Sequence, residues 1–195
     1  MNHLAHVLLA GDDPGLRLGG WLGDFVHGRT ANLALPAAVV RGVSLHRAID
    51  VFTDAHPRVA AARATLPPPW RRYAGILLDM WFDHALARDF AAWSAVPLPA
   101  WSAELRATLA TRAALLPAPA QRFLAWMETN DLPAGYADRT TLRRAIGGIG
   151  QRLRRPNPLA AALPVLEERG VALDAAFQAF FPELQDFAAR WIETH

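Results

Sequence analysis

Histidine and aspartate recur at helical spacing at two places in the N-terminal half of the chain. His46 and Asp50 lie four residues apart, so on a helix they share one face, and Asp54 extends the row by a further turn. Asp79 and Asp83 repeat this spacing among large apolar residues, which indicates that their carboxylates face the interior. A buried carboxylate is costly unless it is paired, hydrogen-bonded or bound to a cation. The two rows therefore indicate a metal or catalytic site.

Other segments offer further donors of the same kind. His3 and His6 lie three residues apart, Asp24 lies in a glycine-flanked segment, and His84 directly follows an aspartate. Histidine and carboxylate groups suit Mn²⁺, Fe²⁺, Mg²⁺ or Zn²⁺. Hydrolysis of a phosphate ester would use such a cation, a group that moves protons and an arginine for the phosphate oxygens. A single His-x-x-x-Asp pair also fits a purely structural hydrogen bond, so the prediction depends on several pairs converging.

Two helices must position these rows. Pro36 opens the first, whose apolar spacing continues to about Thr53, and a triple-proline break precedes the second, from Trp70 to about Trp93. Prolines bound several later helices. They are expected from Pro97 through Leu116, from Pro117 through Met127, and at about 140–153, 158–169 and 174–193.

Length and composition favour one helical domain. The chain has 195 residues, of which 39 are Ala and 27 are Leu, against 15 Val plus Ile. Hydrophobic residues make up 52%, which excludes a disordered chain. We therefore expect residues 1–195 to form a single-domain, all-α helical bundle.

Several protein classes are excluded by what the sequence lacks. Without Cys, there can be no disulfide, zinc ribbon or thiol nucleophile. The first ten residues lack the basic start of a signal peptide. No stretch approaches the roughly 18 apolar residues that a membrane span needs. A cytoplasmic protein with no membrane span is the resulting expectation.

Arginine is concentrated in residues 139–155, where six occur without an acidic residue. A solvated surface is one interpretation, and a docking surface for an acidic protein is another. Nucleic acid would require the same charge, but the chain has no recognisable nucleic-acid module, so no nucleic-acid partner is expected. We call these residues the arginine patch: Arg139, Arg143, Arg144, Arg152, Arg154 and Arg155.

Five segments resemble the acyl-carrier-protein phosphodiesterase family in order and spacing. They are MNHLAH (1–6), GWLGDFVHG (20–28), GVSLHRAIDVFTDAHP (42–57), LDMWFDH (78–84) and FFPEL (180–184). His3 and His27 depart from the family's usual residues, which are apolar and basic respectively. The resemblance implies an HD-domain-like helical fold. It also implies hydrolysis of the phosphodiester between 4′-phosphopantetheine and a serine of holo-acyl carrier protein, with a divalent cation, typically Mn²⁺.

The resemblance further implies roles for individual residues. The expected metal ligands are His6, Asp24, His46, Asp50, Asp83 and His84. Asp79 is expected to be a ligand or to orient one, and Arg47 to bind a phosphate oxygen. Asp54 and His56 are expected to orient ligands or, with His84 as a further candidate, to protonate the leaving serine oxygen. The arginine patch is expected to bind the acidic carrier protein.

Two alternatives remain open from the sequence. The first keeps the metal site in an HD-like phosphohydrolase that acts on a nucleotide or another small phosphoester. The second is a non-catalytic helical binding protein, in which the histidines and aspartates form a structural network.

Overall fold

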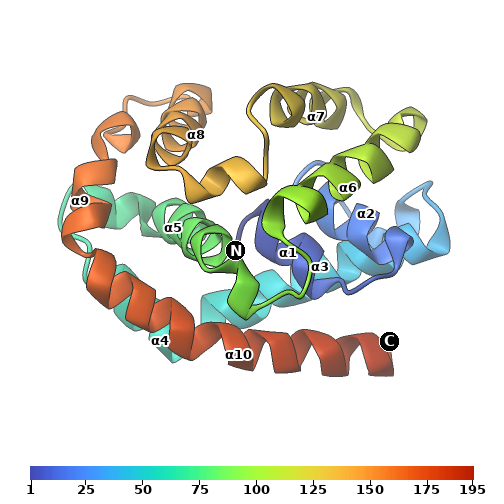
Figure 1. Ribbon diagram of the computed structural model, residues 1–195, viewed down its shortest axis with the longest axis horizontal. Coiled ribbons are helices and arrows are strands. Elements are labelled where there is room, and N and C mark those ends of the chain that lie inside the picture. The colour runs from blue at the N-terminus through green and yellow to red at the C-terminus, as the bar shows by residue number, and fades with distance from the viewer.

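Helices connected by short turns make up the computed structural model, which describes residues 1–195 and contains no β-strand (Figure 1). The α-helices are α1 (His3–Leu9), α2 (Pro14–Leu22), α3 (Ala37–Ala55), α4 (Pro57–Ala64), α5 (Ala74–Arg88), α6 (Leu98–Thr111), α7 (Ala118–Thr129), α8 (Arg139–Arg152), α9 (Leu163–Glu168) and α10 (Gly170–Thr194). Short 3₁₀ helices are η1 (Thr30–Asn32), η2 (Trp70–Tyr73), η3 (Phe90–Ala92), η4 (Ala113–Leu115), η5 (Ala134–Ala137) and η6 (Leu159–Ala161). The all-α prediction is confirmed. None of the helices combines the length and hydropathy that a membrane span requires.

The long predicted helices are present with altered ends. The helix predicted over 70–93 covers only Ala74–Arg88, because 3₁₀ turns take up its two ends. The helix predicted over 158–169 is likewise divided into a 3₁₀ turn and α9, and the one predicted through Leu116 ends at Thr111. The short helices α1, α2 and α4 were not predicted. Helices of seven to nine residues show too few turns for an apolar period to be recognised.

The arrangement places α1, α3 and α5 in the middle of the molecule. In Figure 1, α10 runs along one edge, where it packs on α3, α4 and α5, and α7 and α8 lie along the opposite edge. The buried apolar residues form one core, whose largest side chains are Trp21, Phe82, Phe177, Phe180 and Phe181. The helices that carry most of the predicted site residues are therefore central.

Helices α2 and α3 touch backbone to backbone. A Cβ at Gly19 would overlap the carbonyl oxygen of Val39, and a Cβ at Gly42 would overlap that of Leu16. Because neither position has room for a side chain, the two helices approach more closely than ordinary residues allow. This contact brings the loop that follows α2 against α3.

Candidate functional site

Four of the predicted metal ligands meet where α1, α3 and the end of α2 approach one another. His6 lies on α1, His46 and Asp50 on α3, and Asp24 in the loop directly after α2. His6 Nε2 lies 3.1 Å from Asp50 Oδ1, and His46 Nε2 lies 3.3 Å from Asp50 Oδ2 and 3.6 Å from Asp24 Oδ1. The two imidazoles stack with ring centroids 3.7 Å apart. We call His6, His46 and Asp50 the triad.

The donor atoms of the triad could hold a metal ion. They lie within 4.8 Å of one another. His46 Nδ1 lies 2.8 Å from the carbonyl oxygen of Gly20, which can only accept, so Nδ1 carries the hydrogen and Nε2 faces the carboxylates. His6 Nδ1 is buried without a hydrogen bond, and its buried Nε2 faces the carboxylate of Asp50. Two imidazole Nε2 atoms that converge on one carboxylate fit a divalent cation, and the bond to Gly20 orients His46 as outer partners orient ligands in metal sites.

Gly23 makes room for this arrangement. A Cβ at residue 23 would overlap the ring of His46. Only glycine therefore lets the loop that carries Asp24 lie directly against the imidazole.

The imidazoles of the cluster differ in charge. Burial, together with the neighbouring His46, lowers the pKa of His6 to about 4. Burial also opposes the charged form of His46, but hydrogen bonds with Asp24 and Asp50 outweigh it and raise its pKa to about 9. Burial opposes ionisation of both aspartates, yet the adjacent imidazoles hold the pKa of each carboxyl below its usual range. The two carboxylates are therefore ionised at neutral pH.

Asp83 lies outside the triad and caps α1. It is fully buried, and its carboxylate accepts the backbone N–H groups of Leu4 at 2.8 Å and Ala5 at 3.2 Å. These are among the N–H groups that a helix leaves without partners at its start, and Asn2, which precedes α1, supplies no side-chain cap. Both Asp83 oxygens are thus occupied by the helix that carries His6. Burial raises the pKa of Asp83 to about 7.

An Asp83→Asn substitution is expected to change how stability depends on pH. The folded-state pKa of about 7 exceeds the ordinary value of 3.8, so the folded chain binds this proton more tightly. The contribution of Asp83 to stability is then complete below about pH 4 and is lost as the pH rises through about 7. The melting temperature of the unsubstituted protein, measured relative to that of the variant, should fall across this interval. A difference that stays constant with pH would contradict this role.

Asp79 lies beside the triad, whereas His84 points elsewhere. Asp79 Oδ1 is 3.0 Å from the amino nitrogen of Met1, which is itself 4.0 Å from Asp50 Oδ1. His84 Nδ1 lies 2.7 Å from the carbonyl oxygen of Tyr136, and burial is the main reason that its pKa is lowered. Of these two α5 residues, only Asp79 shares a neighbour with the triad.

Arg47 binds the loop that carries Asp24. Its guanidinium donates to the carbonyl oxygens of Gly28 at 2.8 Å and Val26 at 3.3 Å. Although Arg47 is adjacent to His46 in sequence, successive residues of a helix point about 100° apart. The structure therefore places Arg47 as a support for the loop and not at the triad.

Asp54 and His56 have partners at the end of α3. Asp54 is exposed and pairs with Arg63 at 2.5 Å. His56 Nδ1 accepts the backbone N–H of Arg58 and so caps α4, and its Nε2 lies 3.1 Å from Glu183 of α10. The structure does not bring these two residues to the triad.

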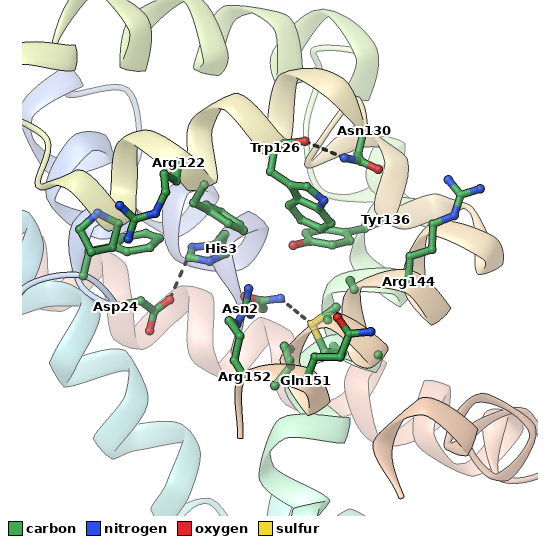
Figure 2. Close-up of a pocket in the computed structure, with 18 residues that line it drawn as sticks. Asn2, His3, Asp24, Arg122, Trp126, Asn130, Tyr136, Arg144, Gln151 and Arg152 are labelled. Carbon is green, nitrogen blue, oxygen red and sulfur yellow. Dashed lines mark hydrogen bonds and ion pairs between the residues drawn. The ribbon is translucent and has the colours of Figure 1, made fainter. Parts of the chain in front are cut away.

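A cavity of about 850 Å³ opens beside the cluster, between α7 and α8 (Figure 2). His3 and Asp24 line it, with His3 Nδ1 3.5 Å from Asp24 Oδ2. Arg122 and Trp126 of α7 also line it. Neither residue could be predicted from the sequence, because each is an isolated residue on an ordinary amphipathic helix. The volume is typical of a small-molecule site.

The arginine patch lies along α8 and the turn that follows it. All six arginines are exposed, and only Arg139 forms an ion pair, with Glu167 at 3.2 Å. Arg144 and Arg152 also line the cavity. The patch is therefore an unneutralised cationic surface that begins at the rim of the cavity.

These features define an all-α protein in which two buried imidazoles and two partly exposed carboxylates form a cluster that could hold a metal ion, next to a cavity with a cationic rim. The chain belongs to the acyl carrier protein phosphodiesterase family, whose sequence profile matches residues 1–184. The resemblance seen in the sequence is thereby confirmed.

Similar proteins described as acyl carrier protein phosphodiesterase cover nearly the whole chain. One from Serratia proteamaculans is 32% identical over 189 residues, which is 96% of this chain and 97% of that protein. One from Escherichia coli O6:H1 is 32% identical over 194 residues, and one from Salmonella dublin is 34% identical over 203 residues. Each of these two covers 97% of this chain and 98% of the relative. No solved structure matches the chain.

Proposed function

We propose that this protein hydrolyses the phosphodiester that joins 4′-phosphopantetheine to a serine of holo-acyl carrier protein. The products are apo-acyl carrier protein, with its serine hydroxyl restored, and free 4′-phosphopantetheine. The observation that carries this proposal is the family match over residues 1–184, which includes every residue of the triad.

Mn²⁺ is the cation in this proposal, held by Nε2 of His6, Nε2 of His46 and the carboxylate of Asp50. Imidazole donors suit Fe²⁺ or Zn²⁺ and carboxylate donors suit Mn²⁺, so this mixed set is compatible with each of the three, whereas Mg²⁺ prefers oxygen ligands alone. The chemistry that the cation supplies is polarisation of the phosphoryl oxygens and a lower pKa for water. Asp24, ionised and 3.6 Å from His46, serves as an additional ligand or orients one.

The remaining α5 residues act around the metal ligands. Asp79, through its contact with the amino group of Met1, orients the carboxylate of Asp50. Asp83 fixes α1, and His84 fixes the turn at Tyr136, so neither ligates the cation in this proposal.

Proton transfer is assigned to His3 and Asp24. Burial lowers the pKa of His3, so the imidazole is neutral at pH 7. With Nδ1 directed at Asp24, Nε2 is left to accept the proton of the attacking water and to deliver it to the leaving serine oxygen. This assignment replaces Asp54 and His56, which are engaged elsewhere. Arg122 and Arg152, which line the cavity, replace Arg47 as donors to the phosphate oxygens.

The test is to incubate the purified protein with holo-acyl carrier protein and Mn²⁺ and to measure the mass of the carrier. Loss of the phosphopantetheine mass is expected, together with Mn²⁺ in elemental analysis of the protein. Turnover of small phosphodiesters but not of the carrier would favour the small-phosphoester alternative. No mass loss with any divalent cation, and a melting temperature that Mn²⁺ does not change, would favour a non-catalytic binding protein.

The arginine patch is the docking surface for the acidic carrier protein in this proposal. Five of its six guanidinium groups have no acidic partner within the chain, so they can pair with carboxylates of another protein. Charge complementarity of this kind acts mainly on the rate of encounter and depends on salt.

Replacing Arg154 and Arg155 together by glutamate is expected to raise KM for the carrier by about tenfold, with kcat little changed. The effect should shrink at about 0.5 M salt, where exposed charges are screened. Arg190→Glu is the matched control, because Arg190 is exposed, has no ion pair and lies on α10 at the opposite edge of the molecule (Figure 1). Because the control reverses one charge and not two, a rise in KM half as large or more would show a general charge effect and contradict docking on the arginine patch.

A further inference from the structure

Two adjacent glycines in the middle of α8 face the cavity. Gly147 and Gly148 both line it, and a Cβ at either position would meet no atom within 4 Å. Glycine in a helix interior is less favourable than alanine, so these two residues weaken α8 without any packing requirement for them. Because these two residues have no side chains, the space beside them in the cavity is open.

The opposite side of the cavity carries aromatic and amide groups. Phe123 and Trp126 of α7 contribute the aromatic surface. The side chain of Gln151 makes no hydrogen bond, and Asn130 uses only its Nδ2, on the carbonyl oxygen of Trp126, which leaves its Oδ1 free. Such walls suit a flexible, uncharged chain that contains amide groups, because aromatic faces pack against methylenes and free amides pair with amides.

Most charged groups of the cavity lie toward its ends. Figure 2 shows Asp24 and Arg122 at one end and Arg144 at the other, with Trp126, Tyr136 and the charged Arg152 between them. His3 is 9% exposed, and its Nδ1 faces Asp24 Oδ2 at 3.5 Å. The guanidinium of Arg122 lies at the same end of the cavity, which indicates where an anionic group of a ligand would lie.

We propose that this cavity binds the pantetheine arm of the substrate, with its phosphate at the His3 and Asp24 end and its amide-containing chain along Gly147 and Gly148. The identity of the arm rests on the proposed function, whereas the path of the ligand rests on the cavity itself. A nucleotide fits less well, because Asp24 is the one carboxylate in the lining and it already faces His3 and His46. No second carboxylate is present to bind a ribose.

The test places side chains into the open space. Gly148→Ala should raise the melting temperature, because α8 gains a better helix former without a clash. Gly148→Leu should fill part of the cavity and weaken binding of free 4′-phosphopantetheine, measured by calorimetry, by at least roughly tenfold. The Gly148→Leu substitution should lower kcat/KM for holo-carrier protein by a factor at least ten times larger than the factor by which it lowers kcat/KM for bis(4-nitrophenyl) phosphate. Gly75→Leu is the matched control, because Gly75 is also helical, lies outside the cavity and has only Arg63 Nη2 nearby, at 3.9 Å.

The outcomes separate the cavity from the proposed function. If Gly148→Leu binds the free arm and processes the carrier like the unsubstituted protein, the cavity assignment is overturned and the proposed function stands. A different outcome is that the unsubstituted protein binds free 4′-phosphopantetheine, that Gly148→Leu abolishes this binding, and that the unsubstituted protein releases no 4′-phosphopantetheine from the carrier. The cavity assignment is then upheld and the proposed function fails. Tighter binding of AMP than of 4′-phosphopantetheine overturns the choice of ligand.

Discussion

An Asp50→Asn substitution is expected to abolish both Mn²⁺ binding and release of the phosphopantetheine arm. Asp50 is the residue that contacts both imidazoles of the triad, His6 at 3.1 Å and His46 at 3.3 Å. Asparagine fills the same volume but brings no negative charge to balance the cation. Removal of a group that only supports a metal ligand costs about 10–100-fold. Loss of a ligand should cost more, and we expect turnover of holo-carrier protein to fall by at least about 10³-fold.

The measurement pairs calorimetric titration of Mn²⁺ with the carrier mass assay. Asp89→Asn is a suitable control, since Asp89 follows α5 at the surface and pairs only with Arg88. Retention of Mn²⁺ affinity and turnover in Asp50→Asn would remove the triad from the proposed mechanism. The fold should survive the substitution, because the side chain of Asp50 is 44% exposed.

Gly23→Ala should be nearly as damaging, although it changes no chemical group of the cluster. The added methyl overlaps the ring of His46, and that ring is tied to the same end of α2 by its hydrogen bond to the carbonyl oxygen of Gly20. The imidazole must therefore move away from Asp50, or the loop must move away with Asp24. We expect turnover to fall by at least about 10²-fold, with weaker Mn²⁺ binding and a loss of stability of about 1–3 kcal/mol from overpacking.

Gly75→Ala separates this steric effect from a general effect of glycine replacement. The nearest atom to a Cβ at residue 75 is 3.9 Å away, so α5 should accept the methyl without adjustment. Its turnover should equal that of the unsubstituted protein in the same assay. If Gly23→Ala also retained full turnover and Mn²⁺ affinity, the close approach of the loop to His46 would be irrelevant to function.

Helical spacing predicts which residues share a face of a helix, but it does not predict which groups that face contacts in the folded protein. It placed His46 and Asp50 correctly on one side of α3, and the structure brings His6 and Asp24 to the same point. The same reasoning put Asp83 on an inward face, where its carboxylate meets the backbone of α1. The partner of an inward carboxylate depends on tertiary packing, which periodicity does not contain.

The cavity was beyond sequence reasoning for a related reason. Its walls come from α7, α8 and the first residues of the chain, and no short motif joins them. The glycine pair on α8 is visible in the sequence, within the arginine-rich segment 139–155. The cost of two consecutive glycines in a helix is the local signal that could have indicated an open surface there.

The contact between Asp83 and α1 has a consequence for biosynthesis. A seven-residue helix is too short to persist by itself in water, so α1 needs the docking that α5 provides. During synthesis, His6 leaves the ribosome well before Asp83. Until Asp83 emerges, the segment that carries His6 has no fixed structure. The chain would then be able to retain a metal ion only after α1 has docked on α5. Measuring metal retention by nascent chains of increasing length would show at which length this docking occurs.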